Sequence, residues 1–407
     1  MPWDPTALGP VVQRMLTTKL QAPVSLGRAA VVADYPACVN AVARWDVKAP
    51  SPSAPKTVIV KYSKRDTDHL LNEWASLEFL NALPTTRELV PTLYGGDIAA
   101  RLLVMEDLAS ADGQLLGHVL DGQKPPNTAS ELEAFQASYG HQAEESLIGL
   151  QRTLGRLHAA TLGRREDFAR ISRRLAATRV SHHRVHDLEN ALAGFATVLQ
   201  EFGVRCSGAV HDELKGALHE LTRPGPYLAF THGDATPANA FVSGVRVRLF
   251  DWETGGFRHA LLDGSFARLR YLHSVWARRI PSSLQRRMLS AYREELLKGF
   301  AAAAEPGRFD FAHASCCAAW LAGLCRFLPD VVERDKKFGR STLRQRIIAG
   351  FEHFIALANE TDLFPALAEA VGKMATRLRG LWPAEGQALP LYRALTASPP
   401  EPPTHPR

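Results

Sequence analysis

Three side chains that can bind metal ions or accept protons lie close together in the second half of the chain. Asp234 and Asn239 belong to the run His-Gly-Asp-Ala-Thr-Pro-Ala-Asn, and Asp251 belongs to Phe-Asp-Trp-Glu, twelve residues after Asn239. Apolar runs around these motifs predict a strand before Asp234 and then a hairpin that turns at Ser243-Gly244. Asp234 and Asp251 should therefore meet at one end of the ribbon. One carboxylate to orient a hydroxyl, with a second carboxylate and an amide oxygen for divalent ions, is the set that phosphoryl transfer needs.

Either tripeptide alone would be read as a capped turn or a strand end, but both together at this spacing resemble a known family. Members of the aminoglycoside phosphotransferase and choline kinase superfamily carry His-Gly-Asp, four further residues and Asn, followed by a hydrophobic residue, Asp and Trp or Phe. The resemblance implies an α+β, two-lobed protein-kinase-like fold, with a small antiparallel-sheet N-terminal lobe and a larger, mainly helical C-terminal lobe. It also implies that Asp234 accepts the substrate proton, that Asn239 and Asp251 hold Mg²⁺ against ATP, and that His232 braces the loop.

A lysine and a glutamate in the N-terminal part form a second candidate pair. Lys61 ends the apolar run Thr-Val-Ile-Val-Lys, which predicts a strand, and Glu73 lies within the apolar stripe of a helix expected from Asp68 to Pro84. A carboxylate in such a stripe needs a cationic partner, because burying it alone is costly. In kinase-like proteins a strand lysine holds the nucleotide phosphates while a helix glutamate fixes the lysine, and Lys61 and Glu73 occur in that order.

The resemblance extends to four more positions. Glu106 and Leu108 follow an apolar strand, where members of the family have the hinge that binds adenine, and Asp263 matches an aspartate that braces the catalytic loop. Asn40 is the polar residue that remains in the nucleotide loop, which reads Ala-Asp-Tyr-Pro-Ala-Cys-Val-Asn over 33–40 and contains no glycine. A glycine-free loop limits how closely backbone N–H groups can approach a phosphate.

The length of 407 residues and the order of the predicted elements favour two lobes. We expect a nucleotide-binding lobe over 1–107, a helical lobe with the catalytic loop and the acceptor site over 108–382, and a proline-rich, disordered tail over 383–407. Strands are predicted at 29–32, 41–47, 57–63 and 102–105. After the site, helices are predicted near 265–278, 282–304, 308–328, 340–358 and 363–380.

Composition indicates a globular protein of a reducing cytoplasm. The chain has no apolar run long enough to span a bilayer, no export signal, and five cysteines without a Cys-x-x-Cys pair. Cys316, Cys317 and Cys325 are predicted to be small buried hydrophobes of a helix. The net charge of +6 comes from basic residues spread along the chain, so we expect neither a nucleic acid nor a membrane as partner. The sequence does not indicate an oligomeric state.

The sequence therefore predicts an ATP-dependent O-phosphotransferase, with GTP as an alternative donor and a hydroxyl group of a small molecule as acceptor. Residues 260–360, expected to build the acceptor pocket, contain 16 Lys or Arg and 10 Asp or Glu, which favours a neutral or anionic acceptor over a polycation. A nucleotide-binding, pseudokinase-like module without efficient transfer is the alternative, supported by the glycine-free loop. A protein kinase fits less well, because His-Gly-Asp and Asp-Trp-Glu replace the His-Arg-Asp and Asp-Phe-Gly of that family.

Overall fold

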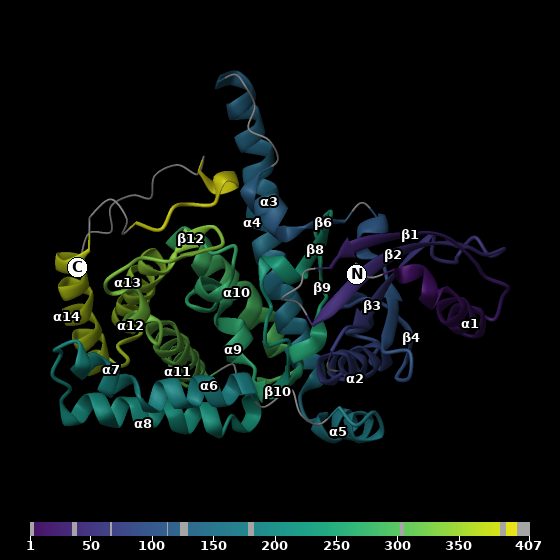
Figure 1. Ribbon diagram of the computed structural model, residues 1–407. Helices are drawn as coiled ribbons and strands as arrows, with labels where there is room; N and C mark the ends of the chain where they lie inside the picture. The colour runs from purple at the N-terminus through teal and green to yellow at the C-terminus, as the bar shows by residue number, and fades with distance from the viewer. Residues whose placement is uncertain are drawn as a thin grey trace. The chain divides into compact units, whose positions relative to one another are not determined.

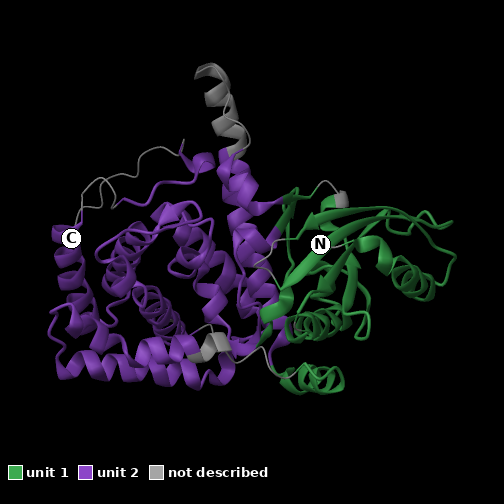
Figure 2. Cartoon of the chain, in the orientation of Figure 1, with its two compact units in different colours: residues 1–114, 163–182, 241–256 green, residues 115–162, 183–240, 257–407 purple. Residues whose placement is uncertain are grey.

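The chain folds into two compact units, coloured separately in Figure 2. The first unit contains residues 1–114, 163–182 and 241–256, and the second contains 115–162, 183–240 and 257–407. Two segments of the predicted helical lobe, 163–182 and 241–256, thus belong to the first unit. The computed structural model describes residues 4–34, 39–65, 67–111, 113–122, 129–177, 183–301, 305–382 and 388–396.

An antiparallel five-stranded sheet is the centre of the first unit, with the strands in the order β1-β2-β3-β5-β4 (Figure 1). The strands are β1 (Ser25–Ala33), β2 (Asn40–Lys48), β3 (Thr57–Ser63), β4 (Leu93–Asp97) and β5 (Leu102–Glu106). The helices are α1 (Gly9–Leu20), α2 (Asp68–Ala82) and α5 (Arg165–Arg174), and the short 3-10 turns are η1 (Pro5–Leu8), η2 (Arg87–Leu89), η3 (Leu108–Ala111) and η6 (Trp252–Thr254). The four predicted strands are all present in this sheet.

The side chains on the two faces of β3 have different surroundings. Val58 and Val60 point to the core beneath α1, where they pack with Trp45 of β2 and Val104 of β5. Because successive side chains of a strand alternate between faces, Lys61 points to the opposite face. Strand β3 is flanked by β2 and β5, so this lysine lies in the middle of the sheet.

Helix α2 packs against β3 and η6 and carries Glu73 on its buried face. Its first helical residue is Asp68, where the helix was expected to begin. The N-cap is the residue before it, Thr67. Glu73 is only 1% exposed, which confirms that the apolar stripe places it inside the protein.

The second unit is mainly helical. Its helices are α3 (Leu116–Asp121), α4 (Ala129–Thr161), α6 (His183–Ala193), α7 (Phe195–Glu201), α8 (Gly208–Thr222), α9 (Leu261–Gly264), α10 (Ser282–Leu297), α11 (Pro306–Cys325), α12 (Leu328–Val331), α13 (Leu343–Thr361) and α14 (Pro365–Leu381). Helix α11 lies against α6, α8 and α13 (Figure 1). Helices α4 and α10 pack closely where Gly155 of α4 faces Tyr292 of α10. A Cβ at Gly155 would lie 2.5 Å from the carbonyl oxygen of Tyr292, so this approach requires glycine. The antiparallel sheet of one unit and the helices of the other confirm the predicted α+β class.

Short strands frame the motif residues. Strand β7 (Leu228–Thr231) pairs with β10 (Gly256–His259), β6 (Gln114–Leu115) and β9 (Arg246–Leu249) flank β8 (Ala240–Ser243), and β11 (Lys337–Phe338) pairs with β12 (Ser341–Thr342). The predicted hairpin is thus β8 and β9, joined across Gly244. The remaining 3-10 turns are η4 (Gly225–Tyr227), η5 (Pro237–Asn239), η7 (Ser265–Ala267), η8 (Arg270–His273) and η11 (Arg393–Leu395).

Two expectations differ from the structure. The helix expected at 265–278 is replaced by the short turns η7 and η8, although residues 265–272 are all buried. In the tail expected to be disordered, residues 388–396 are packed: Tyr392 is fully buried, and Leu391 bridges to Arg279. Residues 383–387 and 397–407 lie outside the described part of the chain.

Cys316, Cys317 and Cys325 are fully buried on α11, as predicted. Burial raises the pKa of the Cys317 thiol to about 12 and raises the pKa values of the other two thiols as well, so all three stay protonated at neutral pH. In the described residues, no helix combines the length and the hydropathy that a membrane span requires.

Candidate functional site

The Lys61 ammonium is the centre of a cluster of acidic side chains in the first unit. Its Nζ lies 2.6 Å from Oε2 of Glu73, 2.5 Å from Oδ1 of Asp251 and 3.1 Å from Oε2 of Glu253. The structure therefore brings Lys61 and Glu73 together and adds two carboxylates, one of which, Glu253, the sequence analysis did not assign.

Backbone and amide contacts hold the acidic segment against α2. The other oxygen of Glu73 accepts the N–H of Trp252 at 3.2 Å, and Asn72 donates to the carbonyl oxygens of Glu253 and Gly255. The carboxylate and amide of one helix turn thus fix residues 252–255. Asn72 was missed because an asparagine on a helix has no recognisable spacing signal.

Three carboxylates around one ammonium leave an excess of negative charge. Burial works to lower the pKa of Lys61, but Asp251, Glu73 and Glu253 raise it well above its usual value, so the amine is charged at neutral pH. Burial raises the pKa of Glu73 to about 7, although Lys61 acts in the opposite direction. A second cation would relieve this excess.

The same carboxylates have the chemistry of a divalent-cation site. One oxygen each from Glu73, Asp251 and Glu253 lies within 4.8 Å of the others, and hard cations such as Mg²⁺ prefer carboxylate oxygens. The backbone of Asp251 is left-handed, with φ of 64°, and its side chain remains about one third exposed. A carboxylate in this position is accessible to an ion.

The other residues predicted for nucleotide binding have internal partners. Asn40 donates to Oε2 of Glu253 at 3.0 Å, which attaches the start of β2 to the Lys61 cluster. Glu106 forms a two-point ion pair with Arg248 of β9, at 2.6 and 2.7 Å, and its own N–H donates to Thr92. Leu108 is buried and begins η3. The side chain and the N–H of Glu106 therefore stabilise the fold, which the sequence did not indicate, and of the loop expected at 33–40, residues 35–38 lie outside the described part.

In the second unit, Asp234 is held by two donors. Its Oδ1 accepts a hydrogen bond from Nη2 of Arg270 at 2.7 Å, and its Oδ2 accepts a hydrogen bond from Nδ2 of Asn239 at 3.1 Å. Asn239 also donates to the carbonyl oxygen of Asp234, while its amide oxygen accepts no hydrogen bond from the described residues. Both amide hydrogens thus point to Asp234, which leaves the oxygen for a cation.

Asp263 supports the loop of Asp234 from behind. It accepts the N–H of His232 at 2.6 Å and that of Gly233 at 3.2 Å, and Nδ1 of His232 accepts the N–H of Asp234. Burial acts to raise the pKa of Asp263, but His158, Arg258 and His232 hold it well below its usual range. The carboxylate therefore remains ionised and keeps the backbone of the loop in place.

Gly233 is required by this geometry. Its φ of 79° is in the left-handed region, and an added Cβ would lie 2.6 Å from the guanidinium of Arg258. Arg258 itself donates to the hydroxyl and carbonyl oxygens of Thr231. The turn before Asp234 therefore accepts only glycine without rearrangement.

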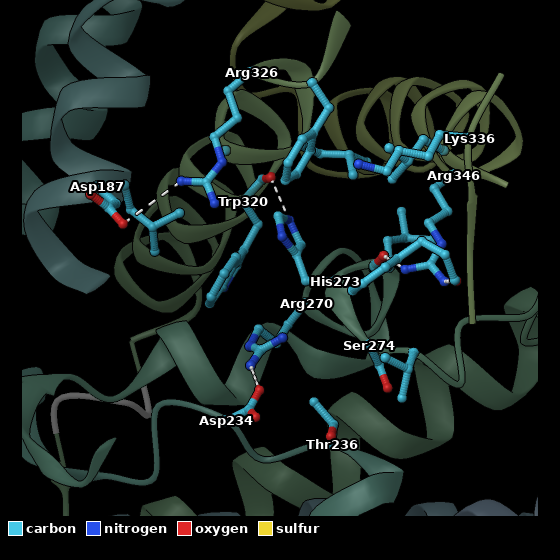
Figure 3. Close-up of a pocket in the computed structure, with 18 of the residues that line it drawn as sticks. Asp187, Asp234, Thr236, Arg270, His273, Ser274, Trp320, Arg326, Lys336 and Arg346 are labelled. Atoms are coloured by element: carbon cyan, nitrogen blue, oxygen red, sulfur yellow. Dashed lines mark hydrogen bonds and ion pairs between the residues drawn. The ribbon is translucent and has the colours of Figure 1, made fainter. Parts of the chain in front are cut away.

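Asp234 opens onto a cavity of about 490 Å³ within the second unit, drawn in Figure 3. Arg270, which the sequence analysis did not assign, connects Asp234 to the wall of the cavity. It pairs with Asp234, and its guanidinium lies 4.4 Å from the centre of the Trp320 ring. Asp234 and Arg270 face each other at one end of the view, and His273 lies beyond Arg270. A small molecule in this cavity would be in reach of the carboxylate that the motif identifies.

No family model and no curated protein sequence matches the chain. Solved structures are similar at low identity. A choline/ethanolamine kinase family protein from Mesorhizobium loti is 16% identical with a TM-score of 0.44, covering 85% of this chain and 92% of that one. A choline kinase from Streptococcus pneumoniae is 14% identical with a TM-score of 0.43 (86% and 99% covered), and a macrolide 2'-phosphotransferase from Brachybacterium faecium is 16% identical with a TM-score of 0.42 (87% and 98% covered). With TM-scores below 0.5, we draw no functional argument from these similarities.

Replacing Lys61 by Met should destabilise the protein by about 3–5 kcal/mol at neutral pH, because three carboxylates then lose their shared cation and Glu73 stays buried. Urea denaturation measures the loss. The folded-state pKa of Glu73 is already raised, so protonation relieves the repulsion, and the destabilisation should grow as the pH rises from about 5 to 8. Lys215→Met is the matched control, since Lys215 pairs with Asp212 on an exposed surface, and it should change little. Equal effects of the two substitutions would contradict the assignment of a buried ion cluster.

Replacing Asp263 by Asn should cost about 3 kcal/mol at neutral pH, because two buried backbone N–H groups lose a charged acceptor. The folded-state pKa of Asp263 is lowered, so its stabilisation is complete above about pH 4 and is lost as the pH falls further. The difference in unfolding free energy between wild type and variant should therefore shrink in acid. Asp212→Asn on the exposed surface is the control, and a pH-independent difference for Asp263→Asn would count against the ionised brace.

Proposed function

We propose that the chain is an ATP-dependent O-phosphotransferase that phosphorylates a hydroxyl group of a small molecule, with GTP as an alternative donor. One observation carries the proposal: the carboxylate of Asp234, oriented by Arg270 and Asn239, opens onto a cavity of about 490 Å³. A positioned carboxylate beside a small-molecule-sized cavity is what general-base assistance to an alcohol requires.

Asp234 is the general base in this proposal. The acceptor hydroxyl would donate a hydrogen bond to Asp234 and attack the γ-phosphorus of the nucleotide in line. A bond forms between the acceptor oxygen and phosphorus, the bond to the β,γ-bridging oxygen breaks, and the nucleoside diphosphate leaves with that electron pair. The hydroxyl proton passes to Asp234. Arg270 fixes the direction of the carboxylate, and the backbone contacts of Asp263 and His232 keep the loop from moving.

Lys61, paired with Glu73, would hold the nucleotide phosphates. Asn40 supports this pair through Glu253. Asn239 offers its unused amide oxygen and Asp251 its exposed carboxylate as ligands for Mg²⁺, which would neutralise charge on the phosphates.

The adenine would bind at the backbone of Glu106 and Leu108. Because the N–H of Glu106 is already bonded to the carbonyl oxygen of Thr92, the contact from Glu106 would have to come from its own carbonyl oxygen. The activity fits the cytoplasm that the buried free thiols favour.

Asp234→Asn tests the assignment. The substitution keeps the shape of the side chain but removes the proton acceptor, so turnover should fall by about 10²–10⁴-fold while nucleotide affinity changes little. The measurement is coupled ATP and GTP consumption with a panel of hydroxylated metabolites, sugars and antibiotics. Asp212→Asn, which makes the same charge change on an exposed surface outside the cavity, should keep turnover. Identical turnover of wild type and Asp234→Asn across the panel would favour the binding module without efficient transfer.

A further inference from the structure

The charged side chains of the cavity differ in how well they are compensated. Three acidic and four basic residues line it: Asp187, Asp234, Asp330, Arg270, Arg326, Lys336 and Arg346. Four of them form pairs, Asp234 with Arg270 at 2.7 Å and Asp187 with Arg326 at 3.7 Å. Paired charges largely cancel, so the potential inside the cavity depends on the other three.

Arg346 is a fully buried cation without a carboxylate partner among the described residues. Its guanidinium donates to the hydroxyl of Ser341 at 2.9 Å and to the carbonyl oxygens of Leu272 and Phe338. Burial lowers the pKa of Arg346 to about 10, which still leaves it charged at neutral pH. Neutral acceptors satisfy its hydrogen bonds but do not neutralise its charge.

Lys336 adds a second positive charge on the same side of Figure 3 as Arg346. Its ammonium forms no ion pair with the described residues. Lys336 and the remaining charge, Asp330, are both exposed, so water and salt screen these two charges alike, whereas the field of the buried Arg346 is screened much less. This end of the cavity is thus positive.

The rest of the wall is uncharged and partly aromatic. Trp320, Phe327 and Phe338 contribute ring surface, and Leu188 and Leu324 contribute aliphatic surface. Burial lowers the pKa of His273 to about 3, so this histidine is neutral at physiological pH. An aromatic or aliphatic molecular body fits between the two polar ends.

We propose that the cavity binds an anionic acceptor, whose carboxylate or phosphate lies toward Lys336 and Arg346 and whose hydroxyl lies toward Asp234. The orientation of the hydroxyl rests on the proposed function, but the preference for an anion rests on the cavity alone. A cationic acceptor would be repelled by the buried arginine, which would not compensate the cost of desolvating that cation.

Ligand binding tests the preference without nucleotide. The probes are benzyl alcohols that carry a carboxylate, a methyl or an ammonium group at the position opposite the hydroxymethyl group, with zero, one or two methylenes before it. Isothermal titration calorimetry should give at least about tenfold tighter binding for the best carboxylate than for its methyl analogue, and weaker binding still for the ammonium analogue. The preference should decrease with salt concentration.

Two neighbouring lysines provide a matched pair of variants. Lys336 lines the cavity, whereas Lys337, the first residue of β11, is exposed and does not. Lys336→Glu should weaken binding of the carboxylate probe about tenfold or more, and Lys337→Glu, with the same change in net charge, should leave it unchanged. Circular dichroism and thermal melting are used to check that both variants fold.

Three results would overturn the inference: equal binding of the three probe types, tightest binding of the ammonium type, or no detectable carboxylate binding. Equal losses in the two lysine variants would also overturn it, because a general charge effect would then explain the preference. Failure of the proposed function has a different signature. In that case the carboxylate probes bind with the expected preference, but no acceptor is phosphorylated and Asp234→Asn changes no turnover.

Discussion

The burial of the Lys61 ammonium is the constraint on which the first unit depends. A charge removed from water is tolerated only when partners in good geometry surround it, and here Glu73, Asp251 and Glu253 do so at 2.5 to 3.1 Å. The requirement ties the consecutive elements β3 and α2 to the segment after β9, where Asp251 lies 190 residues after Lys61. The same pairs that make the burial possible leave excess negative charge, and this property suits a site for a divalent cation.

In the second unit, a buried carboxylate likewise needs partners that stabilise its charge. Asp234 is partly exposed and reactive in the proposal, whereas Asp263 is buried and serves the backbone. Asp263 can remain ionised because two backbone N–H groups and nearby basic side chains stabilise its charge. The loop therefore keeps its shape through a buried carboxylate and presents a second one to the cavity. Arg270 links this loop to Trp320 on α11, so the direction of Asp234 depends on the packing of the helices.

Compensation of charge also distinguishes the two ends of the cavity. At one end, Arg270 neutralises the carboxylate that would accept a proton. At the other end, Arg346 has only neutral acceptors, because it holds the β11–β12 hairpin through Ser341 and Phe338. A structural role and an electrostatic role thus coincide in one side chain. The sequence shows an excess of basic over acidic residues in 260–360, but it does not show which of these charges are buried. Only the structure distinguishes the exposed charges, which solvent screens, from the buried charges, which are screened much less.

The sequence by itself determined the local features. The apolar run that ends at Lys61 predicted a strand, and Glu73 within an apolar stripe predicted a buried carboxylate that needs a cation; both predictions depend on residues that are close together in the sequence. The tertiary structure alone decided which distant groups meet. It paired Asp234 with Arg270 and Glu106 with Arg248, and it replaced the helix expected at 265–278 by two short turns whose buried residues serve long-range contacts. Such pairs depend on how whole elements pack, and no spacing along the chain encodes them.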